Sequence, residues 1–136
     1  MEKHQNKILK KKTLELGQYY GTEQYHSLKP LFQTVVTDGV NYVMNHDYSW
    51  FVTDSIAVIE NPGEIKKLSE YLLKDKFLTV TLNTIDKDNI KMIIEDGNGH
   101  ILYIQKYDCI IADHDIPENQ LKMYWIDGVM LLVGEY

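Results

Sequence analysis

Three carboxylates in the first half of the chain are the strongest candidates for catalysis. Glu23, Asp38 and Asp54 would converge if the helices expected there pack together, and converging carboxylates can hold a divalent metal ion for hydrolysis. Each residue also has a simpler explanation, because acidic side chains commonly cap helices, form turns or stay in solvent. We favour that explanation and keep a small metal-dependent hydrolase or nuclease as an alternative function.

The histidines do not form a recognisable metal site. None of them has the spacing of an HExxH motif or of another paired ligand set; they are His4, His26, His46, His100 and His114. His114 lies in the segment Ala112-Asp113-His114-Asp115, which favours a solvated acidic loop over a metal centre. We therefore predict that the protein holds no metal.

Nucleophilic catalysis is equally unsupported. Cys109 follows Asp108 and precedes two isoleucines, and a carboxylate and apolar neighbours raise the pKa of a thiol, so a buried and unreactive cysteine is expected. The chain contains no GxSxG, P-loop or GxGxxG motif. The sequence therefore predicts no catalytic residue, no cofactor and no enzymatic activity.

The charge of the chain is unevenly distributed. The net charge is −6, but residues 1–12 contain five lysines and one glutamate, which leaves about −10 for the remainder. All 14 basic residues are lysines, whereas arginine is the usual bidentate reader of guanine and phosphate. The missing arginine and the acidic body argue against a sequence-specific DNA reader. The lysines at the start are expected to be solvated.

The length of 136 residues predicts one domain with a core of its own. We expect a Lys-rich N-terminal helix or extension over residues 1–16 and a single α+β domain over residues 17–136. A single cysteine favours a reducing compartment. The chain has no apolar run long enough for a membrane and no secretory leader. These features predict a cytoplasmic protein that does not contact membranes.

Hydrophobic spacing predicts helices first and strands afterwards. Helical spacing occurs over residues 2–15, 31–45, 48–60 and 64–74, although residues 48–60 are also rich in strand-forming side chains. Short apolar or alternating runs follow from Phe77 to the end, separated by turn residues such as those of Asp96–Gly99. The predicted fold is α+β: three or four N-terminal helices packed on one face of a C-terminal four- or five-stranded antiparallel meander sheet.

Four segments carry more specific sequence patterns. They are GTEQY at Gly21–Tyr25, TDGVNY at Thr37–Tyr42, EDGNG at Glu95–Gly99, and Lys122–Tyr136, which ends in DGVMLLVGEY. Together they resemble an uncharacterised family of small proteins carried by phages, plasmids and other mobile elements of bacteria. The resemblance covers residues 17–136 and implies a mobile-element setting without implying a reaction. The motif positions whose role it leaves open are Thr22, Glu23, Asp38, Asp54, Asp96, Asn98 and Asp127. Thr22 suits a helix N-cap, and Asp127 with Gly128 suits a two-residue hairpin turn.

Charge, size and setting favour a binding function. We expect a small acidic accessory protein that inhibits a basic host protein acting on nucleic acid, such as the RNA-guided nuclease of a CRISPR system. An acidic surface would occupy a groove meant for nucleic acid. The expected contact residues are Asp108, Asp113, Asp115, Glu118 and Trp125, because residues 107–136 hold six acids and one lysine. A self-associating structural protein that pairs through a sheet edge is a further alternative, and the oligomeric state stays open.

Overall fold

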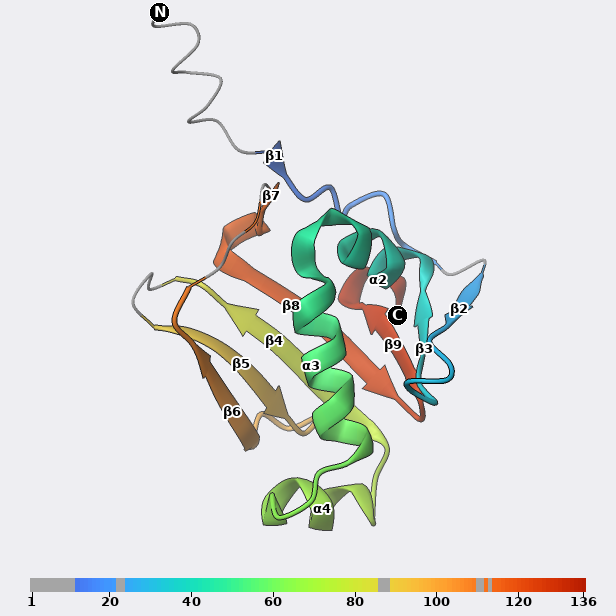
Figure 1. The fold of residues 1–136 in the computed structure, drawn as a ribbon, viewed down its shortest axis with the longest axis vertical. Helices are drawn as coiled ribbons and strands as arrows, with labels where there is room; N and C mark the ends of the chain where they lie inside the picture. The colour runs from blue at the N-terminus through green and yellow to red at the C-terminus, as the bar shows by residue number, and fades with distance from the viewer. Residues whose placement is uncertain (1–11, 22–23, 86–88, 110–111, 113) are drawn as a thin grey trace, which may run out of the picture.

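The computed structural model describes residues 12–21, 24–85, 89–109, 112 and 114–136. Seven of the described strands form one mixed sheet in the order β2-β3-β9-β8-β4-β5-β6 (Figure 1). In this order the strands are β2 (Tyr25–Ser27), β3 (Val35–Thr37), β9 (Val129–Leu132), β8 (Gln120–Ile126), β4 (Phe77–Asn83), β5 (Ile90–Glu95) and β6 (Ile101–Tyr107). Two short strands, β1 (Lys12–Thr13) and β7 (His114–Asp115), pair with each other in parallel and lie beyond the end of the sheet, at the top of Figure 1.

The strand order is not that of a meander. The pairs β4–β5, β5–β6, β4–β8 and β8–β9 are antiparallel, but β8 returns across the sheet to pair with β4 instead of extending from β6. On the other side, β9 pairs in parallel with β3, which comes from the first third of the chain. The predicted four- or five-stranded antiparallel meander is therefore wrong.

The helices are also fewer than predicted. One interrupted helix spans α2 (Asp38–Val43), a π-helical turn (Met44–Tyr48) and α3 (Ser49–Glu60), and a short helix, α4 (Lys66–Leu72), follows it. The helices predicted over residues 48–60 and 64–74 are thus present as α3 and α4. The helix predicted over residues 31–45 is wrong in its first half, because Val35–Thr37 is strand β3.

The first predicted helix is wrong where it can be compared. Lys12–Thr13 is strand β1, and Leu14 and Glu15 after it are not helical; residues 1–11 lie outside the described part of the chain. β1 pairs with β7, and the Leu14 amide continues the pairing by donating to the Asp115 carbonyl. Pairing with a distant segment therefore overrides the helical propensity of this stretch.

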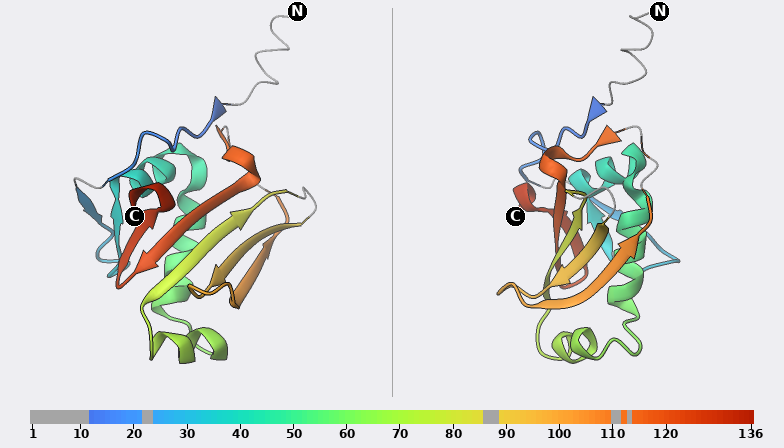
Figure 2. Two further views of the ribbon diagram at one scale, coloured as in Figure 1. Left: turned by 180° about the vertical axis from the view of Figure 1, so that it is seen from behind. Right: turned by 90° about the vertical axis from the view of Figure 1, so that its left-hand side faces the viewer.

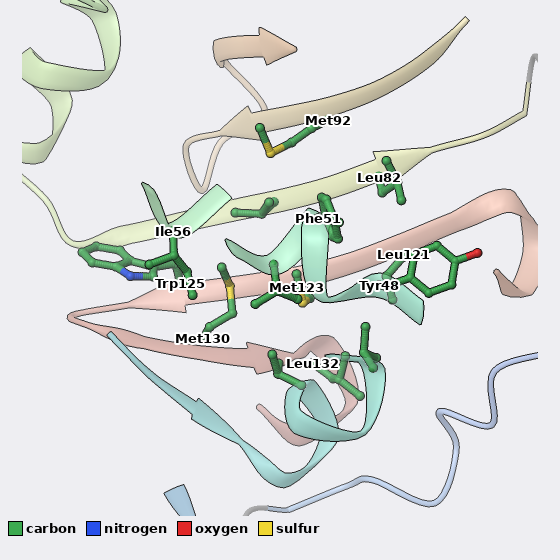
Figure 3. Packing of buried hydrophobic residues seen from close by; sticks show 14 of the residues in the cluster. Tyr48, Phe51, Ile56, Leu82, Met92, Leu121, Met123, Trp125, Met130 and Leu132 are labelled. Atoms are coloured by element: carbon green, nitrogen blue, oxygen red, sulfur yellow. The ribbon is translucent and has the colours of Figure 1, made fainter. Parts of the chain in front are cut away.

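Helix α3 packs across one face of the sheet, and the core lies between them (Figures 1 and 3). Alternate residues of the central strands point toward the helix and are fully buried, for example Leu78, Val80 and Leu82 of β4. Phe51 and Ile56 of α3 are also fully buried and pack against this face. The period of two in the strands thus assigns one face to the core and leaves the other face outside.

Two predicted turns are confirmed. Asp127 and Gly128 both have positive φ, 45° and 86°, and join β8 to β9 as a two-residue hairpin. Gly99 has φ 84° in the turn between β5 and β6. Short 3-10 turns at Pro117–Asn119 and Val133–Glu135 flank the last hairpin. No helix in the described part of the chain is long and apolar enough to cross a membrane.

Candidate functional site

The helix is interrupted between α2 and α3. His46 (φ −124°, ψ 53°) and Asp47 (φ 83°, ψ −4°) leave the helical conformation inside the π-helical turn. A non-glycine residue at positive φ costs on the order of 1 kcal/mol or more, and such residues gather at functional sites. The Asp47 carboxylate uses this position to accept hydrogen bonds from the backbone N–H (3.1 Å) and from Nδ1 (2.8 Å) of His114. The kink therefore fixes a histidine that lies 67 residues further along the chain.

Two histidine rings meet at this kink. Because a carboxylate only accepts, His114 Nδ1 carries the proton in its bond to Asp47. His46 donates from Nδ1 to the Tyr42 carbonyl at 2.7 Å and stacks on the Tyr42 ring at 4.1 Å. The rings of His46 and His114 contact edge to face, with centroids 5.0 Å apart. Each imidazole is thus oriented through Nδ1.

A hollow of about 380 Å³, which we call the acidic hollow, opens beside His114. Its lining residues are Tyr48, Thr84, Ile90, Asp108, Cys109, Ala112, His114, Asp115, Ile116 and Asn119. The Tyr48 hydroxyl donates to the His114 carbonyl at 2.6 Å. Burial, with the nearby Asp115 and Asp47 carboxylates, raises the pKa of Tyr48 to about 12. None of the described lining residues is a lysine, so the hollow presents acidic, neutral polar and apolar groups together.

A second hollow, of about 390 Å³, includes His46 of the kink in its lining. It is lined by Tyr19, His26, Asp38, Asn41, Tyr42, Asn45 and His46. His26 Nε2 donates to the Asp38 carboxylate at 2.9 Å, which joins β2 to the start of α2. This hollow offers side-chain amides and imidazoles, and it is open to solvent.

A buried carboxylate ties the C-terminal turn to the start of α2. Glu135 is 8% exposed, and its carboxylate accepts hydrogen bonds from the Thr37 hydroxyl (2.6 Å), from the Gly39 amide (3.0 Å) and from the Leu132 amide (2.9 Å). Thr37 is also the N-cap of α2, because its hydroxyl accepts from the Val40 amide. We call this arrangement the Glu135 clamp. It was not predicted from the sequence.

The comparisons with known proteins place the chain in a family. The sequence profile of a family of unknown function, DUF6876, matches residues 10–136. The chain belongs to DUF6876. No curated protein and no solved structure matches it. The expected resemblance to an uncharacterised family is thus confirmed, whereas the association with mobile elements stays a prediction.

In this DUF6876 member the two described candidate catalytic carboxylates do not share a site. Asp38 pairs with His26 of β2, whereas Asp54 of α3 accepts a hydrogen bond from the Tyr107 hydroxyl of β6 at 2.9 Å. β2 and β6 are the opposite edges of the seven-stranded sheet. Burial, with Asp54 beside it, raises the pKa of Tyr107. Glu23 lies outside the described residues, so the structure offers no support for a catalytic trio.

The residues predicted to contact a partner are divided by the fold. Asp108 and Asp115 are exposed and line the acidic hollow. Glu118 is exposed in the neighbouring 3-10 turn, at φ 54°. Trp125 is only 7% exposed, and its Nε1 donates to the Thr34 hydroxyl at 3.1 Å, so its ring belongs to the core. Asp113 lies outside the described residues.

Several motif positions have structural roles. The Asp96 carboxylate accepts from the His100 amide, the Asn98 amide and His100 Nδ1, at 2.9, 2.8 and 2.8 Å. These bonds, led by that of the His100 amide, lower the pKa of Asp96 and close the turn. Asn98 is exposed and supplies its backbone to the turn. Asp127 forms the hairpin described above, and Thr22 lies outside the described residues.

One expectation about a reactive side chain is wrong. Cys109 is exposed and lines the acidic hollow, because β6 ends at Tyr107 and the chain leaves the sheet there. Within the described ranges, no group of three or more His, Cys, Asp or Glu side chains is arranged to hold a metal ion.

Proposed function

We propose that this protein binds a basic surface of a host protein that acts on nucleic acid, such as an RNA-guided nuclease, and blocks it. The acidic hollow is the proposed contact. In this proposal the protein acts as an accessory factor of a mobile element, the setting that its sequence motifs imply. It works by occupying a surface and requires no chemistry of its own.

The observation that carries the proposal is the composition of the hollow. Asp108 and Asp115 line it together, and no described lining residue is a lysine. Ile90 and Ile116 supply apolar surface beside them. A lysine or arginine side chain has the complementary character, because its long stem packs on apolar surface while its charged end meets carboxylates. The hollow therefore fits a cationic side chain of a protein partner.

The kink helps to keep the hollow in shape. His114 is held from one side by the Asp47 carboxylate and from the other by the Tyr48 hydroxyl, which donates to its carbonyl. The neighbouring Asp115 lies on β7, whose register with β1 is set by backbone pairing. A preorganised site loses less conformational entropy when a partner docks, which supports binding as the role of the strained turn.

Charge reversal in the hollow tests this proposal. The variant Asp108→Lys/Asp115→Lys is compared with Glu64→Lys/Glu70→Lys, a change of equal charge at exposed positions around α4. The assay measures inhibition of, and binding to, purified RNA-guided nucleases of the host. Losing two surface ion pairs and gaining repulsion should cost about 1–3 kcal/mol, which weakens binding about 5- to 150-fold. The control pair should change affinity much less.

Salt provides an independent readout. Association should be fast at low ionic strength and slow down as salt screens the rim over a Debye length of about 8 Å at physiological strength. The proposal is wrong if no basic nucleic-acid-processing protein binds. It is also wrong if the hollow variant inhibits as well as the wild-type protein, or if both variants lose binding equally.

A further inference from the structure

The face of the sheet that points away from α3 is not covered by any described helix (Figure 2, left). We call it the outer face. The pairing registers place its side chains in rows across β8, β4, β5 and β6. One row is Lys122, Thr81, Ile93 and Ile104, and the next row is Gln120, Asn83, Lys91 and Lys106. The outer face therefore combines apolar side chains with lysines.

The charge of the outer face is opposite to that of the protein. Lys91, Lys106 and Lys122 lie in two adjacent rows, and Glu95 is the acid that the same registers place on this face. The chain as a whole carries a net charge of −6. Three lysines gathered on one face of an acidic protein point to an anionic partner.

Aromatic rings adjoin these lysines. Phe77 and Tyr124 lie on β4 and β8 with ring centroids 5.1 Å apart, and Tyr136 packs on both, at 6.2 and 5.3 Å. Tyr136 is 74% exposed. A hollow of about 290 Å³ beside the rings is lined by Phe77, Thr79, Glu95, Asp96, Gly97, Gly99, Lys122 and Tyr124, so Lys122 shares it with two carboxylates. Ring faces and ammonium groups thus occur within one surface.

An unsatisfied hydroxyl lies at the centre of the outer face. Thr81 is only 4% exposed, and among the described residues its Oγ1 is the buried side-chain polar atom without a hydrogen-bond partner. Its cross-strand neighbours are Lys122 and Ile93. A buried hydroxyl without a partner is costly, and a ligand that hydrogen-bonds to it would remove that cost.

We propose that the outer face binds single-stranded nucleic acid. The phosphates contact Lys91, Lys106 and Lys122, and bases stack on Tyr124 and Tyr136. Single strands expose both charges and ring faces, and a lysine track beside aromatic rings matches both. A duplex hides its base faces, and an acidic protein segment would use the lysines alone. Because lysine and tyrosine contacts do not read base edges, the binding tolerates many sequences.

This surface is separate from the acidic hollow. None of Lys91, Lys106, Lys122 and Tyr124 lines that hollow. The inference therefore stands even if the hollow has no partner, and its variants leave Asp108 and Asp115 intact.

The test uses the full chain and a fluorescent single strand of about 16 nucleotides, as DNA and as RNA, in anisotropy titrations. Lys91→Gln/Lys106→Gln/Lys122→Gln is compared with Lys66→Gln/Lys67→Gln/Lys74→Gln, which removes the same charge from exposed positions around α4. The first variant should bind at least tenfold more weakly and lower the slope of log K against log salt by about 2, near 0.7 for each lysine. The α4 variant should bind as the wild type does.

Tyr124 separates stacking from charge. Tyr124→Ala should weaken binding roughly tenfold without changing the salt slope, and Tyr124→Phe should retain the affinity. The proposal is overturned if the protein does not bind at about 50 mM salt. It is also overturned if the outer-face lysine variant binds as the wild type does, which would assign binding elsewhere, such as to the N-terminal lysines. A third contrary result is that polyglutamate displaces the labelled strand as well as an unlabelled strand does, while Tyr124→Ala binds as the wild type does. That result would indicate an acidic protein partner.

Discussion

The Glu135 clamp supports the sharpest prediction about stability. Glu135→Ala removes the carboxylate to which the Thr37 hydroxyl and the Gly39 and Leu132 amides donate. These three donors are then left without that acceptor. A hydrogen bond to a charged group contributes about 1.5 kcal/mol or more, so three contribute at least about 4 kcal/mol. Water entering the space would restore part of this. We expect a loss of about 3–5 kcal/mol, a large share of the 5–15 kcal/mol typical of a domain.

Gly39 makes the same prediction testable from the opposite side. A Cβ at this position would lie 2.5 Å from Glu135 Oε1 and 2.6 Å from Leu132 Cδ1. Gly39→Ala should therefore destabilise the protein by about 1–3 kcal/mol through overpacking. In the double variant with Glu135→Ala, the new methyl group enters space that the carboxylate has left. The loss of stability in the double variant should then be smaller than the sum of the two single losses by about 1–3 kcal/mol.

Urea unfolding followed by tryptophan fluorescence measures all four states of this cycle. The midpoint should shift at an unchanged slope, since the folded and unfolded surfaces stay similar. Glu70→Ala, at an exposed position of α4, is the control and should change stability by less than about 0.5 kcal/mol. The clamp is refuted if the two single losses of unfolding free energy add up to the loss in the double variant within about 0.5 kcal/mol. It is also refuted if Glu135→Ala alone loses less than about 1 kcal/mol.

Two further predictions concern pH. Burial and the Asp115 and Asp47 carboxylates raise the pKa of Tyr48 to about 12. The neutral hydroxyl therefore contributes fully to the free energy of unfolding below the unfolded pKa near 10, and this contribution disappears as pH rises from about 10 to about 12. Tyr48→Phe should flatten the fall in unfolding free energy over this range and lose about 1 kcal/mol at neutral pH; an unchanged alkaline slope would contradict this. The His100 amide is the chief cause that lowers the pKa of Asp96. The Asp96 carboxylate therefore contributes to stability above its unfolded pKa, and this contribution is lost as pH falls through the folded pKa. Asp96→Ala should lower the urea midpoint at neutral pH, and its midpoint should then decrease less than that of the wild type as pH is lowered. If the midpoints of variant and wild type decrease in parallel below neutral pH, this account is wrong.

The parts of the fold that were predictable are those set by neighbouring residues. Helices α3 and α4 follow from apolar spacing, and the turns at Asp96–Gly99 and Asp127–Gly128 follow from residues that tolerate positive φ. Val35–Thr37 was misread because Val35 and Val36 fall in register with Val40 at helical spacing. The strand forms because β3 pairs with β9, some 94 residues later. Local periodicity contains no information about such a partner.

The same limit explains what was missed at the site. The cluster at the kink joins Asp47 to His114 across 67 residues, and the clamp joins Thr37 to Glu135 across 98. Neither pair has a fixed spacing that a motif search detects. Asp108 and Asp115, which were named from the excess of acids in one segment, line the acidic hollow, and their contact with a partner stays a prediction. Trp125 was also predicted as a contact residue but is buried in the core, because aromatic content does not tell which face of a strand a ring occupies.

The motifs by which the chain resembles its family are occupied with holding the fold. Thr37, Gly39 and Glu135 satisfy one another at the start of α2, and Asp96 closes a turn. A side chain whose bonding capacity is spent inside the fold has little left for a ligand. Among the described residues, both proposed binding surfaces, the acidic hollow and the Lys-bearing outer face, keep polar groups that no motif covers as a unit. A protein that meets a cationic partner with one surface and an anionic strand with the other is suited to a nucleoprotein target, since such a target presents both charges together.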